Sequence, residues 1–178
     1  MRPSLPQIVS AICLTLCSAL ALAADSDGDG ISDAIEASNG ADPYSKYAVS
    51  AGYRHTCALD DNGVTCWGQD FYGETDVPSL SNPVAISTGY GHTCALDDNG
   101  VTCWGSNSEG QTDVPSLSNP VAVSVGGQYS CALDDNGVIC WGYNIDGQTD
   151  VPSLSNPVAV SSGSDHTCAL DDNGVTCW

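Results

Sequence analysis

The sequence predicts an all-β fold built by stacking four copies of one unit, and three observations support that prediction. A segment that reads HTCALDDNGVTCWG at His55 returns at His92, Tyr129 and His166, each time 37 residues later. Each copy contains short runs rich in Val, Ile, Thr and Cys, separated by Gly, Pro, Asn and Asp. No run has the 3.6-residue periodicity of a helix. Short strands repeated at a fixed period are typical of propellers and solenoids.

The N-terminus predicts export. Residues 1–23 combine a basic start at Arg2, an apolar run and the small-x-small triplet that ends at Ala23, the pattern of a cleaved signal peptide. A lipid-modified Cys17 is an alternative, although the preceding Leu16 is larger than such a site prefers. No other apolar run is long enough to span a bilayer. We therefore expect a secreted or cell-surface protein, in the extracellular or periplasmic space.

Residues 24–47 form an acidic segment whose first part has the spacing of a calcium-binding loop. In DSDGDGISDAIE, carboxylates occupy positions 1, 3, 5, 9 and 12 and Gly30 occupies position 6, where a sharp turn is needed. With NGADP after it, the segment resembles a thrombospondin type 3 calcium repeat, which implies a loop followed by a short helix. The alternative is a disordered acidic linker. The predicted calcium ligands are Asp25, Asp27, Asp29, the Ile31 carbonyl, Asp33 and Glu36.

Residues 48–178 contain the repeats, which we divide into 48–83, 84–120, 121–157 and 158–178. In the second copy, strands are predicted at 84–88, 92–96 and 101–104, with turn residues between them. Three or four short strands in 37 residues match the size of a propeller blade. The sequence thus predicts a partial β-propeller of four blades, the last one truncated after its third strand. Open edges would then favour a longer chain or self-association.

The hairpin in each copy sets the partners of its two cysteines. A type I turn at Asp60–Gly63, with Gly63 in the left-handed bulge position, places Leu59 opposite Val64 and Cys57 opposite Cys66. A two-residue turn at Asn62–Gly63 would instead misalign the cysteines. Opposed residues lie within reach of a disulfide, and eight cysteines in an exported domain favour that pairing. The predicted disulfides are Cys57–Cys66, Cys94–Cys103, Cys131–Cys140 and Cys168–Cys177.

Two metal-site alternatives are weaker. His55 with Cys57 and Cys66 could offer three zinc ligands, but the third copy has Tyr129 at the His position and keeps both cysteines. The histidines are better explained as fillers of a blade interface or loop. A cation site at the Asp-Asp-Asn-Gly hairpin tips is a second alternative, but turn chemistry already explains those residues.

The charge of the chain restricts its partners. There are 22 Asp and Glu against three Lys and Arg, so the formal net charge is −19. Nucleic acid is excluded as a natural partner, because affinity for phosphate backbones comes mostly from Lys and Arg. Cations or a basic protein surface are favoured, and solubility outside the cell is a simpler explanation of the charge.

The pattern G-x-x-H-T-C-A-L-x-x-x-G-V-x-C-W-G-x-N-x-x-G-Q, clearest from Gly89 to Gln111, resembles the regulator of chromosome condensation repeat, which implies a propeller. The TDVP that follows at Thr75, Thr112 and Thr149 makes it most similar to secreted bacterial members with short blades, such as the propeller-type beta-lactamase inhibitor proteins. Because the family includes a nuclear exchange factor, inhibitors and surface proteins, the resemblance does not define one function.

Differences between copies locate the candidate site. TDVPSLSNPVA is repeated unchanged, whereas two tracts vary: 53–54, 90–91, 127–128 and 164–165, and then 69–72, 106–109 and 143–146. Equivalent loops of an array lie on one face, which predicts a protein-binding surface with aromatic anchors. Drift in unconstrained loops is the alternative. The predicted partner-binding residues are Tyr53, Arg54, Asp70, Phe71, Tyr72, Tyr90, Asn107, Gln128, Tyr129, Tyr143, Asn144 and Asp146.

We therefore expect an exported, non-enzymatic protein that binds a protein partner, possibly a basic one, through this face. The alternative is a structural or adhesive, calcium-stabilised surface module. A sialidase-like enzyme is disfavoured, because Leu59 stands where an Asp-box turn needs Ser, and Arg54 is the only arginine after the signal segment.

Overall fold

Each of the four copies folds into one three-stranded antiparallel sheet in which the strands are paired in chain order. The computed structural model describes residues 47–178, so the predicted signal segment and calcium loop lie outside the described residues. The strands are β1 (Ala48–Ala51), β2 (His55–Asp60), β3 (Gly63–Gly68), β4 (Ala85–Thr88), β5 (His92–Asp97), β6 (Gly100–Gly105), β7 (Ala122–Val125), β8 (Tyr129–Asp134), β9 (Gly137–Gly142), β10 (Ala159–Ser162), β11 (Thr167–Asp171) and β12 (Gly174–Cys177).

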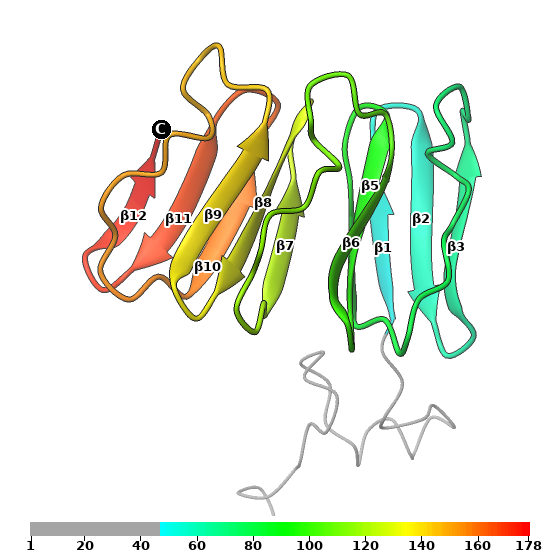
Figure 1. Cartoon of the computed structure of the whole chain (residues 1–178), viewed down its shortest axis with the longest axis horizontal. Helices are drawn as coiled ribbons and strands as arrows, with labels where there is room; N and C mark the ends of the chain where they lie inside the picture. Colours follow the sequence, from blue (N-terminus) through cyan, green and yellow to red (C-terminus); the bar gives the residue numbers. More distant parts are fainter. Residues whose placement is uncertain (1–46) are drawn as a thin grey trace, which may run out of the picture. The chain divides into compact units, whose positions relative to one another are not determined.

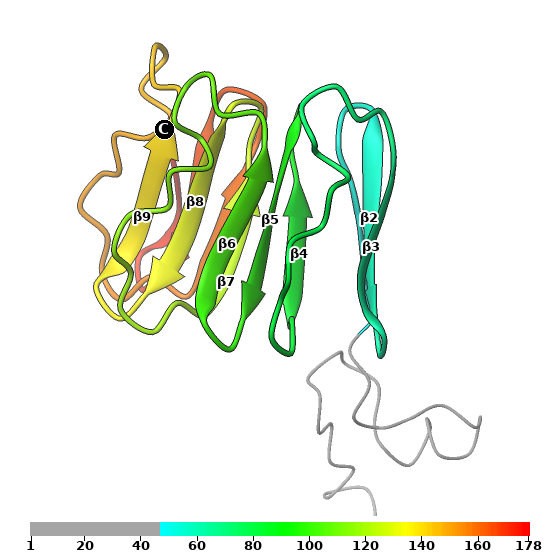
Figure 2. The same cartoon turned by 45° about the vertical axis from the view of Figure 1, so that its right-hand side comes forward.

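The four sheets stand side by side in chain order as the blades of a partial propeller (Figure 1). The first strand of each blade contacts the first strand of the next, so β1, β4, β7 and β10 form one row. Figure 2 shows β4, β5 and β6 of the second blade beside one another. The all-β blade architecture predicted from the repeats is confirmed. In the described part of the chain, no helix has the length and apolar character needed to cross a membrane.

The hairpin register agrees with the prediction. Leu59 is opposite Val64 and Cys57 is opposite Cys66, and the later copies repeat this pairing. Gly63 has a φ of 106°, the left-handed conformation that the turn requires. All four predicted disulfides are formed, with Cα atoms 4.0 to 4.1 Å apart. Each disulfide therefore joins the second and third strands of one blade.

The middle strands of the second and third blades, β5 and β8, are covered on both faces, whereas β2 and β11 are covered mainly on one face. In β2 the side chains of His55, Cys57 and Leu59 are buried and alternate with more exposed ones, whereas every residue of β5 and β8 is buried. The face that carries His, Cys and Leu packs on the next blade. The opposite face of β11, with Thr167, Ala169 and Asp171, is the buried one in the fourth blade.

The unchanged loop between blades is explained by its contacts with the following hairpin. The backbone N–H of Ser81 donates to Asp97 Oδ2 at 2.8 Å, and the amide of Asn82 donates to Asp98 Oδ2. The same pair of bonds recurs at the next two blades. Asn82 has a φ of 49°, a left-handed conformation that Asn tolerates better than most residues. The recurring Ser-Asn-Pro therefore fastens each loop to the next blade.

Candidate functional site

The two variable tracts of each copy meet at one end of the blades, which we call the loop face. The strand register places the end of the first strand, the start of the second and the end of the third together. Backbone bonds join the tracts directly: Gln69 N–H donates to the Arg54 carbonyl at 2.9 Å, and Tyr143 N–H donates to the Gln128 carbonyl at 3.0 Å. The loop face comprises residues 52–54, 89–91, 126–128 and 163–165, together with 69–72, 106–109 and 143–146.

A groove with a volume of about 520 Å³ lies on the loop face over the first two blades and reaches the third. Its walls are glycines, tyrosines and uncharged polar side chains, with one cation. The lining residues are Tyr53, Arg54, Gln69, Tyr72, Tyr90, Gly91, Gly105, Ser106, Asn107, Ser108, Gln111, Gly127 and Gln128. A concave site with aromatic walls and a few convergent polar groups is the usual form of a binding site.

The aromatic side chains of the groove hold one another in place. The rings of Tyr53 and Tyr90 lie with their centroids 5.1 Å apart at an angle of 40°. The guanidinium carbon of Arg54 lies 4.9 Å from the centre of the Tyr53 ring, a cation–π contact. Tyr72 packs its ring on Gly91, where a Cβ would come within 3.2 Å of it. These contacts give the groove a defined aromatic wall.

Several predicted contact residues line this groove, and others lie beside it. Phe71 is 77% exposed on the same loops but outside the groove lining. Asp70 and Asp146 are also exposed there, and Tyr143 is half-buried. The six predicted residues that line the groove are Tyr53, Arg54, Tyr72, Tyr90, Asn107 and Gln128.

The polar side chains at the start of the second tract stabilise their own loops. Asn107 accepts the Thr112 N–H at 3.1 Å, and Asn144 accepts the Thr149 N–H at 2.9 Å. Asp70 does the same for the Thr75 N–H at 3.0 Å. One oxygen of each is thus already used by the loop, which leaves the aromatic side chains as the main free contact surface.

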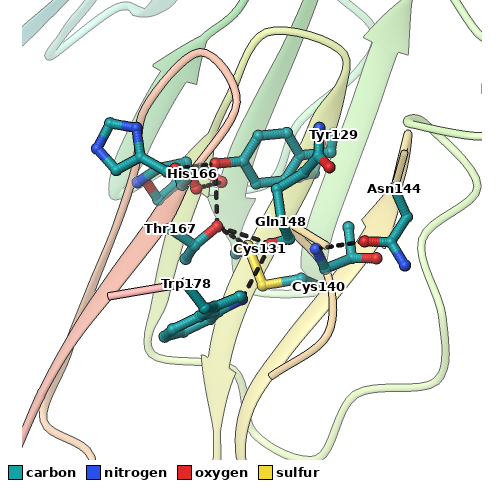
Figure 3. Close-up of a disulfide and its surroundings, with 12 residues drawn as sticks. Tyr129, Cys131, Cys140, Asn144, Gln148, His166, Thr167 and Trp178 are labelled. Atoms are coloured by element: carbon teal, nitrogen blue, oxygen red, sulfur yellow. Dashed lines mark hydrogen bonds between the residues drawn. A yellow bond between two sulfur atoms is a disulfide. The ribbon is translucent and has the colours of Figure 1, made fainter. Parts of the chain in front are cut away.

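Tyr129 corrects the prediction, because it does not lie on the loop face. Its side chain is 0% exposed at the boundary between the third and fourth blades (Figure 3). Its hydroxyl accepts a hydrogen bond from Thr167 Oγ1 at 2.9 Å and donates to the His166 carbonyl. Burial raises the pKa of this hydroxyl. Tyr129 therefore stabilises the blade interface, as the histidines do in the first two blades.

His55 and His92 lie in the blade interfaces. Thr93 donates its hydroxyl proton to the Glu74 carbonyl, so it accepts a hydrogen bond from His55 Nε2, 2.8 Å away. His92 Nε2 lies 3.0 Å from Ser130 Oγ in the same arrangement. Burial lowers the pKa of both imidazoles, that of His92 to about 4. With Cys57 in a disulfide, this cluster is structural, and within residues 47–178 no three His, Cys, Asp or Glu side chains gather closely enough to hold a metal ion.

Glu74 is a site residue that sequence reasoning missed. It is 0% exposed, and its carboxylate accepts the Tyr72 N–H at 2.7 Å and a bond from the Gln69 amide at 3.4 Å. Gln111 and Gln148 occupy the equivalent positions in the next two copies. The sequence signal for this residue is that Glu74 stands where the next two copies have Gln. Glu74 supports the groove wall from behind.

Three of the four copies match a known repeat family. The sequence pattern of the Regulator of chromosome condensation (RCC1) repeat matches residues 47–74, 84–111 and 121–148. These segments are RCC1 repeats. Each match begins just before the first strand of a blade and ends at the buried Glu or Gln that supports the second tract. The RCC1 repeat therefore spans one blade together with its part of the loop face.

Solved structures with this architecture include two plant receptor ectodomains. The ectodomain of the receptor kinase CR4 from Physcomitrella patens has a TM-score of 0.64 at 26% identity, covering 76% of this chain and 41% of that chain. The CRINKLY WD40 ectodomain of the Arabidopsis thaliana receptor kinase ACR4 has a TM-score of 0.60 at 26% identity, covering 74% and 49%.

A yeast protein has the same fold. Prp20p from Saccharomyces cerevisiae, whose structure was described with its binding to Gsp1p and histones, has a TM-score of 0.61 at 19% identity, covering 73% of this chain and 42% of that chain. The chain thus spans less than half the length of each of these three structures. None of the curated proteins matches the chain.

Proposed function

We propose that residues 47–178 form a non-enzymatic module that works outside the cell and binds a protein partner through the loop face. The observation that carries this proposal is the groove walled by Tyr53, Tyr72 and Tyr90, which lie in the two variable tracts of the copies. Interfaces are enriched in such aromatic anchors, because they combine large contact area with few rotatable bonds.

The periodic residues support this assignment because they already have structural roles. Asp97, Ser81 and Asn82 fasten the inter-blade loop, and His55 and Thr93 join two blades. A site for a specific partner then has to use the non-periodic side chains. Those side chains are concentrated on the loop face, with Phe71 and Tyr72 exposed at its surface.

A binding role is favoured over catalysis by the composition of the groove. Of the residues that line it, none is a His, Asp, Glu, Cys or Lys, so Ser106 and Ser108 have none of these side chains beside them in the lining as a general base. Its polar members are amides, hydroxyls and Arg54. These groups suit recognition by hydrogen bonds.

Action outside the cell is supported by four disulfides in 132 described residues and by the predicted signal segment. The plant relatives are ectodomains, and the yeast relative has protein partners. Among family members, the short blades favour the secreted bacterial type. The net charge of −19 favours a partner whose surface is basic around the contact.

The acidic segment at 25–36 is proposed to bind calcium and to order the chain ahead of the first blade. Its carboxylate spacing supports this role. If the loop face bound nothing, a calcium-stabilised structural or adhesive module would be the function that remains.

Site-specific photo-crosslinking tests the binding proposal. p-Benzoylphenylalanine replaces Phe71 on the loop face or, as the matched control, Val121 at the opposite end of the blades, where 66% of the side chain is exposed. In native extracellular material, we expect a discrete crosslinked protein from position 71 and none from position 121. Equal crosslinking from both positions, or none from position 71, would remove the loop face as the site.

A further inference from the structure

The groove on the loop face is the one place in the described chain where a positive side chain is presented. Arg54 is the only Lys or Arg among residues 47–178, and it lines the groove. No carboxylate is among the lining residues, although the chain carries 22 Asp and Glu. Arg54 is therefore the only formally charged side chain among the residues that line the groove.

Two contacts hold the Arg54 side chain in place, and they leave N–H donors of the guanidinium available for a ligand. Its cation lies over the Tyr53 ring, and Nη1 donates to the Gln69 Oε1 at 3.2 Å. A guanidinium carries five N–H donors in a planar fork, which matches the two oxygens of a carboxylate. The Tyr53 ring, which is tilted against Tyr90, lies against the guanidinium and restricts the movement of this fork. Little side-chain entropy then remains to be lost on binding.

Glu74 explains why Gln69 presents its oxygen to Arg54. A carboxylate can only accept hydrogen bonds, so Gln69 turns its NH₂ group to Glu74 and its oxygen to Arg54. In the next two copies the supporting residue is Gln111 or Gln148, which imposes no such direction. The first copy thus combines a buried acceptor, an oriented amide and a cation. The charge of Glu74 itself lies behind Gln69 and outside the groove lining.

We propose that the groove accepts an Asp or Glu side chain of the partner, next to an aromatic residue in the partner sequence. The carboxylate pairs with the Arg54 fork, and the neighbouring ring packs on Tyr72 and Tyr90. Charge complementarity at Arg54 selects the acid, since a Lys in its place would meet a like charge. This inference rests on the proposed function: it names the residue type that a generally basic partner inserts at the centre of the contact.

Short capped peptides test this recognition directly. The probes are Ac-Gly-Trp-Asp-Gly-NH₂ and the same peptide with Asn or Lys in place of Asp. Binding to the full chain is followed by NMR of protein labelled with ¹³C in its tyrosines. We expect saturable shifts of Tyr53, Tyr72 and Tyr90 with the Asp peptide and affinity about ten-fold lower with the Asn peptide, since a charge-assisted bond contributes about that factor. The Lys peptide should bind weakest.

Variants assign the preference to one residue. Arg54→Gln should make the Asp and Asn peptides bind alike, and Asp61→Asn, an exposed change in the β2–β3 turn at the opposite end of the first blade, should leave the preference intact. Added salt should weaken only the Asp peptide. Equal binding of the three peptides, a preference for Lys, or no saturable shift with the Asp peptide would each overturn the inference. A partner crosslinked at position 71 despite such a result would leave the proposed function standing, whereas the loss of crosslinking would remove the function itself.

Discussion

Acid should destabilise the blades because two buried histidines must stay neutral. His92 is 0% exposed; its Nε2 hydrogen-bonds Ser130, while its Nδ1 has no partner among the described residues. A proton added at Nδ1 would therefore place an unsatisfied charge in the interface, which is why burial lowers the pKa of His92 to about 4. His55 has the same arrangement and a pKa lowered for the same reason.

The direction of the pH effect follows from this shift. The unfolded chain takes up the proton with a pKa near 6.5, whereas folded His92 does so only near 4. The contribution to the free energy of unfolding is therefore complete above about pH 6.5 and lost as the pH falls toward 4. At about 1.36 kcal/mol per pKa unit, the full loss is roughly 3 kcal/mol, of which roughly 2 kcal/mol is lost by pH 5. His55 adds to the loss.

The titration of Asp134 and Asp171 does not overlap with that of His92. Hydrogen bonds from the Ser118 and Ser155 backbones lower the pKa values of Asp134 and Asp171 below the ordinary 3.8. Both carboxylates therefore stay ionised throughout the interval in which His92 titrates. Their contribution is lost only in stronger acid.

Guanidinium unfolding followed by tryptophan fluorescence, at about pH 7.5 and pH 5 with disulfides intact, measures the effect. The wild type should lose at least roughly 2 kcal/mol of unfolding free energy between the two conditions. His92→Gln should lose clearly less, because the titrating group is gone. His166→Gln is the matched control, since His166 is exposed and its variant should follow the wild type. An identical pH dependence in His92→Gln and the wild type would refute the argument.

Three further outcomes are expected. Asp97→Ala should lower the free energy of unfolding by about 1 to 2 kcal/mol more than Asp60→Ala, because Asp97 also accepts the Ser81 N–H; equal losses in chemical denaturation would contradict the docking role. Calorimetric titration with calcium should give binding heat with the wild type and none with the Asp27→Ala/Asp29→Ala variant. Equal heats from both proteins would rule out calcium binding by this loop. Exposed apolar side chains on the sheets β1–β3 and β10–β12 should cause self-association, which a native mass of one folded chain would exclude.

The hairpins could be predicted in detail because their causes are local. The turn at Asp60–Gly63 and the spacing of Cys57 and Cys66 leave one register in which both requirements are met, and the structure has that register. Turn chemistry and a covalent bond act within ten residues of sequence. No knowledge of neighbouring blades was needed.

Contacts between blades were harder to predict, although their signals were present. Ser81 and Asp97 recur together in each copy, but the sequence does not show that the Ser81 N–H binds the Asp97 carboxylate 16 residues later. Tyr129 is among the contact residues predicted from the sequence, but it is buried between two blades. Its register in phase with His55 and His92 pointed to the interface, where its longer side chain reaches Thr167 and the His166 carbonyl.

A residue that differs from its counterparts in the other copies is informative when a second such residue interacts with it. Tyr129 replaces His, but it keeps a hydrogen bond to the next blade, so that change preserves the scaffold. Glu74 replaces Gln and keeps the bond to a backbone N–H two residues earlier, yet it also buries a carboxylate. Gln69 is the tract residue that can answer this carboxylate with an amide donor, and it then offers its oxygen to Arg54. Glu74, Gln69 and Arg54 all differ from their counterparts in the other copies, and hydrogen bonds link them in one chain that ends at the groove. Independent drift of three positions does not readily explain such a linked set.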